Sequence, residues 1–292
     1  MATTIGLLHP GDMGAVVGAC ARAAGQRVLW ASAGRSADTR ARATAGSLED
    51  AGTVAEVLAA SDVVLSICPP HAALDLAREV AARRFAGLFV DGNAVAPATA
   101  REIGAIVEGG GATFVDGGLI GPPPRTAGST RLYLSGREAK RAVALFEGSA
   151  LEAIAVNDVP GAASALKMVY AAFTKGTSAL LMGVRALAAS EGVDDALLAE
   201  WHRSQPELPK KSEAAARDNA RKAWRFVGEM EEIASTFAAV GLPDGFHLAA
   251  RQIYQRLEQY KDAAIPPSFA EVAGAILNAS RAPAPSRNST SP

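Results

Sequence analysis

The sequence has little of what marks the specialised classes of protein. Of its 292 residues only 2 are cysteines, aromatic residues make up 5%, and the formal net charge is −1. Because Cys20 and Cys68 do not have metal-ligand spacing, we expect reduced packing residues and no metal site. Charges of both signs are mixed, without a basic stripe or an acidic tail, which argues against a nucleic-acid partner.

Long apolar runs and a leader segment are also missing. The most apolar helical stretch, residues 179–184, lies between Lys175 and Arg185, so no segment reaches the length of a membrane span. The N-terminus enters a predicted strand at once, without the positively charged region of a signal peptide. We therefore expect a cytoplasmic protein with no membrane partner.

Apolar residues are nevertheless abundant, at 49%, and in the first half their pattern alternates between strand and helix. This alternation predicts an α/β fold, a Rossmann-type parallel sheet with helices on both faces. The predicted strands are 3–8, 27–31, 62–67, 87–91, 113–116, 130–135 and 153–156. The predicted helices between them are 14–24, 54–60, 72–84 and 97–108.

The second half shows no strand pattern. No proline occurs between Pro160 and Pro206, and Ala, Leu and Met dominate, which predicts a long helix over 162–190 that is buried by other helices or by another subunit. Further helices are predicted at 194–204, 213–240 with a break at Gly228, 245–260 and 269–279. The expected organisation is an α/β domain at 1–158, an all-α domain at 159–280 and a disordered tail at 281–292.

A glycine turn follows the first predicted strand. Residues 9–14 approximate the G-x-G-x-x-G pattern, with His9 in place of the first glycine, and precede an alanine-rich helix. Such a turn lets a dinucleotide pyrophosphate approach backbone N–H groups at a helix N-terminus. A tight turn before a helix that binds no ligand explains the same residues. We expect His9 to pack beneath the turn, because a base has no role there. The expected cofactor contacts here are Leu8, His9, Pro10, Gly11, Asp12, Met13 and Gly14.

The second predicted strand ends without the acidic residue that would bind a ribose 2′-hydroxyl in an NAD site. Ser32, Arg35 and Ser36 stand there instead, and a guanidinium with hydroxyl donors suits a 2′-phosphate. This favours NADP over NAD, the other interpretation being a solvated loop. Later strand ends, where the rest of the cofactor would lie, carry Cys68, Pro69, Pro70, Asn93 and Ala94.

Four motifs, in order, resemble those of the β-hydroxyacid dehydrogenases and the related 6-phosphogluconate dehydrogenases. They are the opening strand and turn at 5–14, the segment 91–97 expected near the nicotinamide, the substrate-loop motif 114–121, and the helix 161–176 around Lys167. Segment 222–232 is similar to a little-characterised subgroup with its own helical C-terminal domain. The resemblance spans residues 3–280 and identifies the domain at 1–158 as the NADP-binding one.

The resemblance implies that Lys167 is the general base for a substrate hydroxyl. A lysine in an otherwise apolar helix is desolvated, which lowers its pKa toward neutrality and favours this role. From the residues alone, a lysine whose charged end reaches solvent is the alternative. Tyr170, one turn further along, is a second catalytic candidate, or else a packed ring with a local hydrogen bond.

The sequence departs from the family pattern where the substrate would bind. Ala171 stands in place of an asparagine, and Tyr170 and Thr174 replace the histidine and glutamate of the decarboxylating phosphogluconate enzymes. Ile120 replaces a serine in the substrate loop. We therefore expect no phosphogluconate decarboxylation and a less polar substrate. The expected substrate contacts are Gly117, Gly118, Leu119, Ile120, Gly121, Ala171, Thr174 and Trp224.

The function predicted from these features is that of an NADP-dependent oxidoreductase for a small hydroxy acid or its keto form. One alternative is an imine reductase, from a sister group of the same architecture that generally lacks the lysine. Another is a non-catalytic NADPH-binding protein. The resemblance also implies a homodimer through the helical domain, in which Trp224 borders the partner's site; otherwise Trp224 belongs to the core.

Overall fold

The computed structural model describes residues 2–261 and 263–278. The chain forms two compact units. Unit 1 comprises Met1–Tyr170 with Ser235–Val240, and unit 2 comprises Ala171–Ala234 with Gly241–Pro292. The units therefore divide inside a long helix, whereas the sequence places the domain boundary before it, at 158/159. The tail expected at 281–292 lies outside the described residues.

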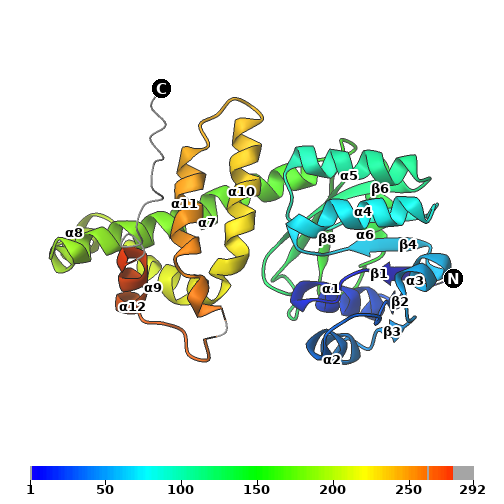
Figure 1. The fold of residues 1–292 in the computed structure, drawn as a ribbon, viewed down its shortest axis with the longest axis horizontal. Coiled ribbons are helices and arrows are strands. Elements are labelled where there is room, and N and C mark those ends of the chain that lie inside the picture. The colour runs from blue at the N-terminus through cyan, green and yellow to red at the C-terminus, as the bar shows by residue number, and fades with distance from the viewer. Residues whose placement is uncertain (1, 262, 279–292) are drawn as a thin grey trace, which may run out of the picture. The chain divides into compact units, whose positions relative to one another are not determined.

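Unit 1 is built on one eight-stranded sheet with the order β3-β2-β1-β4-β5-β6-β7-β8 (Figure 1). Neighbouring strands are parallel, except that β6 and β7 are antiparallel. In the Rossmann order 3-2-1-4-5-6, ligands lie beyond the carboxyl ends of the parallel strands. The strands are β1 (Thr4–Leu7), β2 (Arg27–Trp30), β3 (Glu49–Asp50), β4 (Val63–Ser66), β5 (Leu88–Asp91), β6 (Thr113–Ile120), β7 (Arg131–Ser135) and β8 (Glu152–Asn157).

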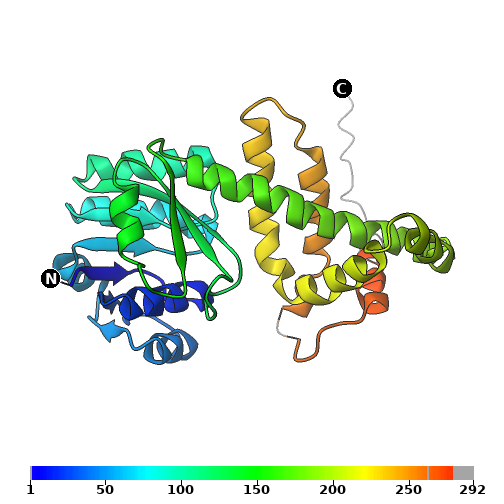
Figure 2. The same cartoon turned by 180° about the vertical axis from the view of Figure 1, so that it is seen from behind.

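Helices cover both faces of this sheet, as the two opposite views show (Figure 2). One face packs against α1, α2 and α6, and the other against α3, α4 and α5. The helices are α1 (Asp12–Ala23), α2 (Ala37–Ala45), α3 (Val54–Ala60), α4 (Ala73–Ala82), α5 (Pro97–Gly109) and α6 (Ala139–Ala144), with a short 3-10 turn at Pro70–Ala72.

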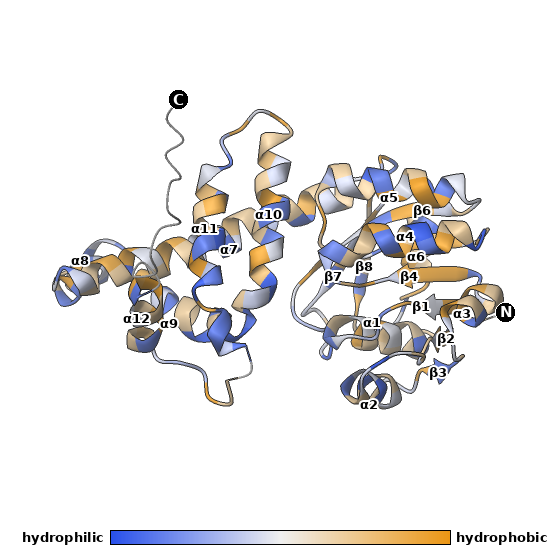
Figure 3. Ribbon diagram, in the orientation of Figure 1, coloured by the Kyte–Doolittle hydropathy of each residue, from blue (hydrophilic) through white to orange (hydrophobic). Residues whose placement is uncertain are grey.

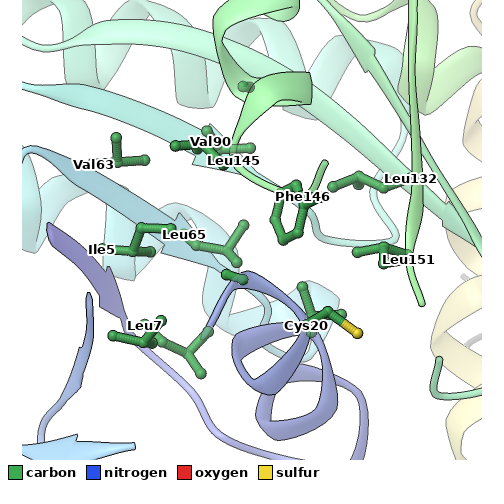
Figure 4. Close-up of a cluster of buried hydrophobic side chains, with 14 of the residues drawn as sticks. Ile5, Leu7, Cys20, Val63, Leu65, Val90, Leu132, Leu145, Phe146 and Leu151 are labelled. Carbon is green, nitrogen blue, oxygen red and sulfur yellow. The ribbon is translucent and has the colours of Figure 1, made fainter. Parts of the chain in front are cut away.

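The core of unit 1 follows the two-residue period of the strands. In β2, Val28 and Trp30 belong to one buried cluster, and Leu29 between them belongs to the other. Figure 4 shows the first cluster, in which strand residues meet side chains of α1 and of the segment after α6. A strand buried on both faces needs mostly apolar residues, and β4 is hydrophobic over Val63, Val64 and Leu65 before it ends at buried Ser66 (Figure 3).

Unit 2 consists of helices, and no strand occurs among its described residues. Buried Arg185 of α7 connects several of them. Its guanidinium donates to both carboxylate oxygens of Asp194, at 3.0 and 2.6 Å, and lies 3.8 Å from the centroid of the Phe269 ring. The helices are α7 (Ala162–Ser190), which begins in unit 1, α8 (Asp194–Ser204), α9 (Leu208–Asn219), α10 (Ala223–Ala238), α11 (Gly245–Gln255) and α12 (Phe269–Asn278), with 3-10 turns at Ala220–Lys222 and Glu258–Tyr260.

The structure confirms the predicted fold class, but several predicted elements are wrong in detail. Elements β3, α2 and α6 were not predicted from the sequence; α2 buries a single residue, Ala43, and so has almost no apolar period. The helix predicted over 213–240 is interrupted at Ala220–Lys222 rather than at Gly228. One glycine costs a helix only about 1 kcal/mol, which is too little to break α10. Across the described ranges, no helix combines the length and the apolar character needed to cross a bilayer.

Candidate active site

The turn between β1 and α1 has the backbone geometry of a phosphate-binding turn. The Gly11 N–H donates to the His9 carbonyl at 2.9 Å, and no side chain caps the start of α1 at Gly11. A Cβ on Gly14 would lie 2.2 Å from the His9 carbonyl oxygen, so only glycine fits there. The first N–H groups of α1 are thus accessible donors at the positive end of a helix dipole.

The His9 side chain contacts the residue predicted to bind a 2′-phosphate. Its Nε2 lies 2.9 Å from Nη1 of Arg35. Burial, and then the charge of Arg35, lower the pKa of His9 to about 4. His9 Nδ1 and Arg35 Nε are buried and have no hydrogen-bond partner within the protein.

The loop after β2 contains groups of both charges. Ser36 caps α2, since its Oγ accepts from the Thr39 N–H at 3.3 Å, and Arg40 donates to the Ser32 carbonyl at 2.9 Å. The Ser32 hydroxyl hydrogen-bonds Asp50 of β3 and lowers the pKa of that carboxyl. Asp50 was not predicted as a site residue, because the two-residue strand β3 that carries it was not predicted.

Asn93 joins the carboxyl ends of β4 and β5. Its side-chain oxygen accepts from the Cys68 N–H at 2.5 Å, and its amide donates to Ser66 Oγ at 3.0 Å and to the Asp91 carboxylate. Asn93 therefore fixes the carboxyl ends of β4 and β5, where a cofactor was predicted to bind. Burial raises the pKa of the Cys68 thiol to about 12, so this cysteine is not a thiolate nucleophile.

Two buried carboxyl groups lie side by side on the neighbouring strands β5 and β6. Asp91 and Asp116 are in register on β5 and β6, and neither is exposed to solvent. Asp116 accepts from Ser135 Oγ at 2.9 Å and from the Ser164 N–H and Oγ at 3.0 and 2.5 Å. Asp91 Oδ2 has no partner, and burial together with the charge of Asp116 raises the pKa of Asp91 well above its usual value.

The bonds of Asp116 fix the start of α7, which carries Lys167. The Ala163 N–H also donates to Ser135 Oγ, at 3.0 Å, so β6 and β7 both hold the first turn of this helix. A Cβ on Gly118 would lie 2.7 Å from the Ala163 carbonyl oxygen and 3.0 Å from Lys167 Cβ. The half-buried Lys167 is therefore packed directly against the substrate-loop motif.

The other predicted substrate residues have varied surroundings. Leu119 and Ile120 are buried within β6, while Gly121 has a φ of +128°, which only glycine adopts easily. Gly117 packs against the Asp91 carbonyl, 2.7 Å from where its Cβ would stand. On α7, Ala171 is buried and Thr174 half-buried, whereas Tyr170 is 49% exposed.

Segment 222–232 supplies structural contacts of unit 2. Glu229 forms an ion pair with Lys175 of α7, and both side chains are 15% exposed. Lys175 Nζ also lies 4.7 Å from the centroid of the Phe226 ring. Trp224 is 39% exposed, with Lys261 Nζ 4.5 Å from its ring centroid. The sequence analysis did not single out Lys175, because its charge is matched only by a residue far along the chain.

Comparison with known proteins agrees with this architecture. A model of a domain of unknown function (DUF1932) matches residues 188–257. An uncharacterised 28.5 kDa protein in the 7S RNA 5′ region of Methanothermus fervidus is 31% identical over 138 residues, 47% of this chain. That match covers 52% of the relative, so the chain spans about half the length of this curated protein.

Solved structures extend the likeness to nearly the whole chain. The conserved protein MTH1747, described as similar to 3-hydroxyacid dehydrogenases, is 26% identical, with a TM-score of 0.68 over 88% of this chain and 98% of that one. The 3-hydroxyisobutyrate dehydrogenase of Mycobacterium tuberculosis is 21% identical, with a TM-score of 0.68 over 97% and 100%. The reductive aminase of Aspergillus terreus, solved with NADPH4, cyclohexanone and allyl amine, is 15% identical, with a TM-score of 0.56 over 94% and 99%.

The fold is one shared by NAD(P)-dependent dehydrogenases and imine reductases. The chain thus has the fold of the 3-hydroxyacid dehydrogenases, and its residues 188–257 match the DUF1932 domain.

Proposed function

We propose that the protein is an NADP-dependent oxidoreductase that interconverts a small hydroxy acid and its keto form, with Lys167 as the general base. The observation that carries this proposal is the packing of Lys167 against Gly118, on a helix whose first turn is held by Asp116. A catalytic base needs a fixed position, and this arrangement supplies it at the carboxyl edge of the sheet.

The residues of unit 1 fit a dinucleotide phosphate. The uncapped start of α1, the close approach at Gly14, and the buried donors on His9 and Arg35 all favour an anionic ligand rich in acceptors. Arg35 favours the 2′-phosphate of NADP. Asp50 favours a free 2′-hydroxyl, but Arg40 lies close enough to lower the pKa of Asp50 through its charge. We therefore infer a preference for NADP that rests on Arg35.

The proton chemistry follows from the position of Lys167. When bound, the nicotinamide supplies a hydride acceptor or donor. In the oxidation direction, neutral Lys167 Nζ takes the proton of the substrate hydroxyl as the carbon loses its hydride. In the reverse direction, protonated Nζ returns that proton to the oxygen. Tyr170 lies one turn further on the same helix and is a candidate to orient the substrate.

An imine substrate is the second candidate, because the helix face beyond Lys167 lacks the expected polar anchors. Ala171 is buried and apolar where the family has asparagine, and Ile120 is held inside β6. The absence of these polar groups favours a less polar substrate than phosphogluconate. Relatives of similar fold include imine reductases and a reductive aminase, which adds weight to this alternative.

We also propose that the chain forms a homodimer through its helical domain. Leu166, Phe173, Leu180 and Leu187 recur at every seventh position along α7, and they are 37%, 74%, 49% and 61% exposed. An exposed apolar stripe of this period is typical of helices that pair with another helix. A dimer in solution, lost on Phe173→Glu with Leu187→Glu, is the expected result of light scattering; a wild-type monomer would contradict it.

Turnover by the purified protein tests the proposed activity. Nicotinamide absorbance would be followed with hydroxy acids and NADP⁺ and, in parallel, with cyclic imines and NADPH. For a hydroxy acid, Lys167→Ala should lower kcat on the order of 10²–10⁴-fold, while Lys140→Ala, an exposed control on α6, should not. Imine turnover that survives Lys167→Ala would favour the second candidate. NADPH binding without any turnover would favour a non-catalytic protein.

A further inference from the structure

His9 stands where the dinucleotide-binding pattern has its first glycine, yet the backbone there does not require glycine. Among the described residues, the non-glycine positions with positive φ are Ser47 and Arg84, and His9 is not one of them. The turn itself uses the His9 carbonyl, which accepts from Gly11 and faces Gly14. What this chain gains by having histidine at position 9 is therefore the imidazole.

The imidazole is bonded to Arg35 in a way that fixes its protonation. A guanidinium can only donate, so the Nε2 atom 2.9 Å from Arg35 Nη1 must offer its lone pair. His9 is then neutral, with its hydrogen on Nδ1. Burial and then the charge of Arg35 lower the pKa of His9 to about 4, while the backbone of Leu8 and the charge of Glu79 act in the opposite direction.

Both partners retain a donor that the protein does not use. Arg35 Nε is buried without a hydrogen-bond partner in the protein, and buried His9 Nδ1 forms no well-aligned hydrogen bond, although the Leu8 backbone is close enough to raise the pKa of His9. A buried polar group without a partner costs about 1–3 kcal/mol. Two such donors beside the uncapped start of α1 match a ligand with several anionic oxygens.

We propose that His9 is a specificity-determining residue that orients Arg35 toward the 2′-phosphate and so couples the pyrophosphate turn to the selection of NADPH over NADH. This inference rests on the proposed function, because it takes the ligand to be a nicotinamide dinucleotide. An arginine on an unconstrained loop pays side-chain entropy on binding, whereas one already bonded to His9 is pre-organised. His9 acts through Arg35 and is a positioning residue, not a catalytic one.

Dinucleotide affinities of the full chain test the proposal without any substrate. Kd for NADPH and for NADH would be measured by titration calorimetry for the wild type, Arg35→Ala, His9→Gly, His9→Gln, and His9→Gly combined with Arg35→Ala. His9→Gly restores the glycine pattern, and His9→Gln keeps an acceptor for Arg35. His202→Gln, an exposed change on α8, is the control, and circular dichroism would verify folding of each variant.

The wild type should bind NADPH more tightly than NADH, and Arg35→Ala should raise the Kd for NADPH at least tenfold. His9→Gly should weaken NADPH about fivefold with little change for NADH, His9→Gln should stay within twofold of the wild type, and the double variant should be no worse than Arg35→Ala alone. Selective NADPH binding that His9→Gly leaves intact, or an equal loss for both dinucleotides, would overturn the inference alone. A folded wild type that binds neither dinucleotide would overturn the proposed function and this inference together.

Discussion

The two units of the molecule differ in how their buried charged groups are paired. In unit 2, Arg185 is matched by Asp194 and Glu213, and Lys175 is matched by Glu229. In unit 1, atoms of His9, Arg35 and Asp91 are buried without a partner at the carboxyl edge of the sheet. The comparison assigns a structural role to the charges that are paired within the protein, and favours a ligand for the donors of His9 and Arg35 beside the glycine turn.

The same contrast exists between two neighbouring residues of unit 1. Asp91 and Asp116 occupy paired positions on adjacent strands, and both are fully buried. Asp116 accepts three hydrogen bonds that hold the start of α7, but one oxygen of Asp91 accepts none. Burial alone therefore does not decide the role of a carboxyl group; its donors do.

The largest expected loss of stability comes from opening the charge network of unit 2. Arg185→Met should lower the free energy of unfolding by about 3 kcal/mol, because it removes the cation shared by two carboxylates and leaves one of them partly buried. NADPH affinity should not change. Urea denaturation followed by circular dichroism gives the first quantity and calorimetry the second.

Arg83→Met is the matched control, because Arg83 pairs with Glu79 on the surface. It should change the free energy of unfolding by no more than about 0.5 kcal/mol. An equal effect of the two substitutions would contradict the assignment of Arg185 as a structural centre.

A smaller loss is expected from Asp116→Asn. An Asn side chain has one acceptor oxygen where Asp116 has two, so it cannot accept all three of the hydrogen bonds from Ser135 and Ser164; the anchor of α7 loosens, at a cost of about 2 kcal/mol. Because Lys167 follows one turn later, kcat should fall as well. If denaturation and turnover both stayed at wild-type levels, the bonds of Asp116 would not position this helix.

The smallest change in the free energy of unfolding, an increase instead of a loss, is expected from Asp91→Asn. The pKa of Asp91 is raised in the folded state, so folding requires a proton once the pH exceeds the unfolded value of about 3.9. The contribution of Asp91 to the stability of the wild type is fully present below that pH. It is lost as the pH rises through the pKa of Asp91 in the folded protein. Asp91→Asn avoids this loss, so it should equal the wild type in acid and exceed it above neutral pH.

Denaturation midpoints of both proteins across a pH series test this prediction. If the difference in midpoint between Asp91→Asn and the wild type narrowed toward high pH, Asp91 would be ionised in the folded protein and the prediction would be wrong.

The sequence predicted those parts of the molecule that depend on local pattern. The helix over 162–190 and the strands around Val64 and Phe89 follow from apolar period and length, and the structure has them. The predicted turn at 9–14 is also present, but the site residues assigned from it remain predictions. The bond between His9 and Arg35 could not be predicted, because it joins residues 26 positions apart after two strands have paired.

Other features depended on long-range packing. The ion pair of Lys175 with Glu229 spans 54 positions, and the anchor of Ser164 on Asp116 spans 48. Strand β3 was missed because two exposed acidic residues carry no strand pattern, and with it Asp50 was missed. Charges paired across such distances leave no periodic signal in the sequence.

Hydrogen exchange of the full chain, measured with and without NADPH, reports where the dinucleotide binds. If the unpartnered polar edge of unit 1 binds the dinucleotide, exchange should slow at residues 9–15 and 32–36, and α9 in unit 2, far from any predicted cofactor residue in sequence, should not change. Unchanged exchange at both unit 1 segments, at an NADPH concentration that saturates binding, would contradict the account.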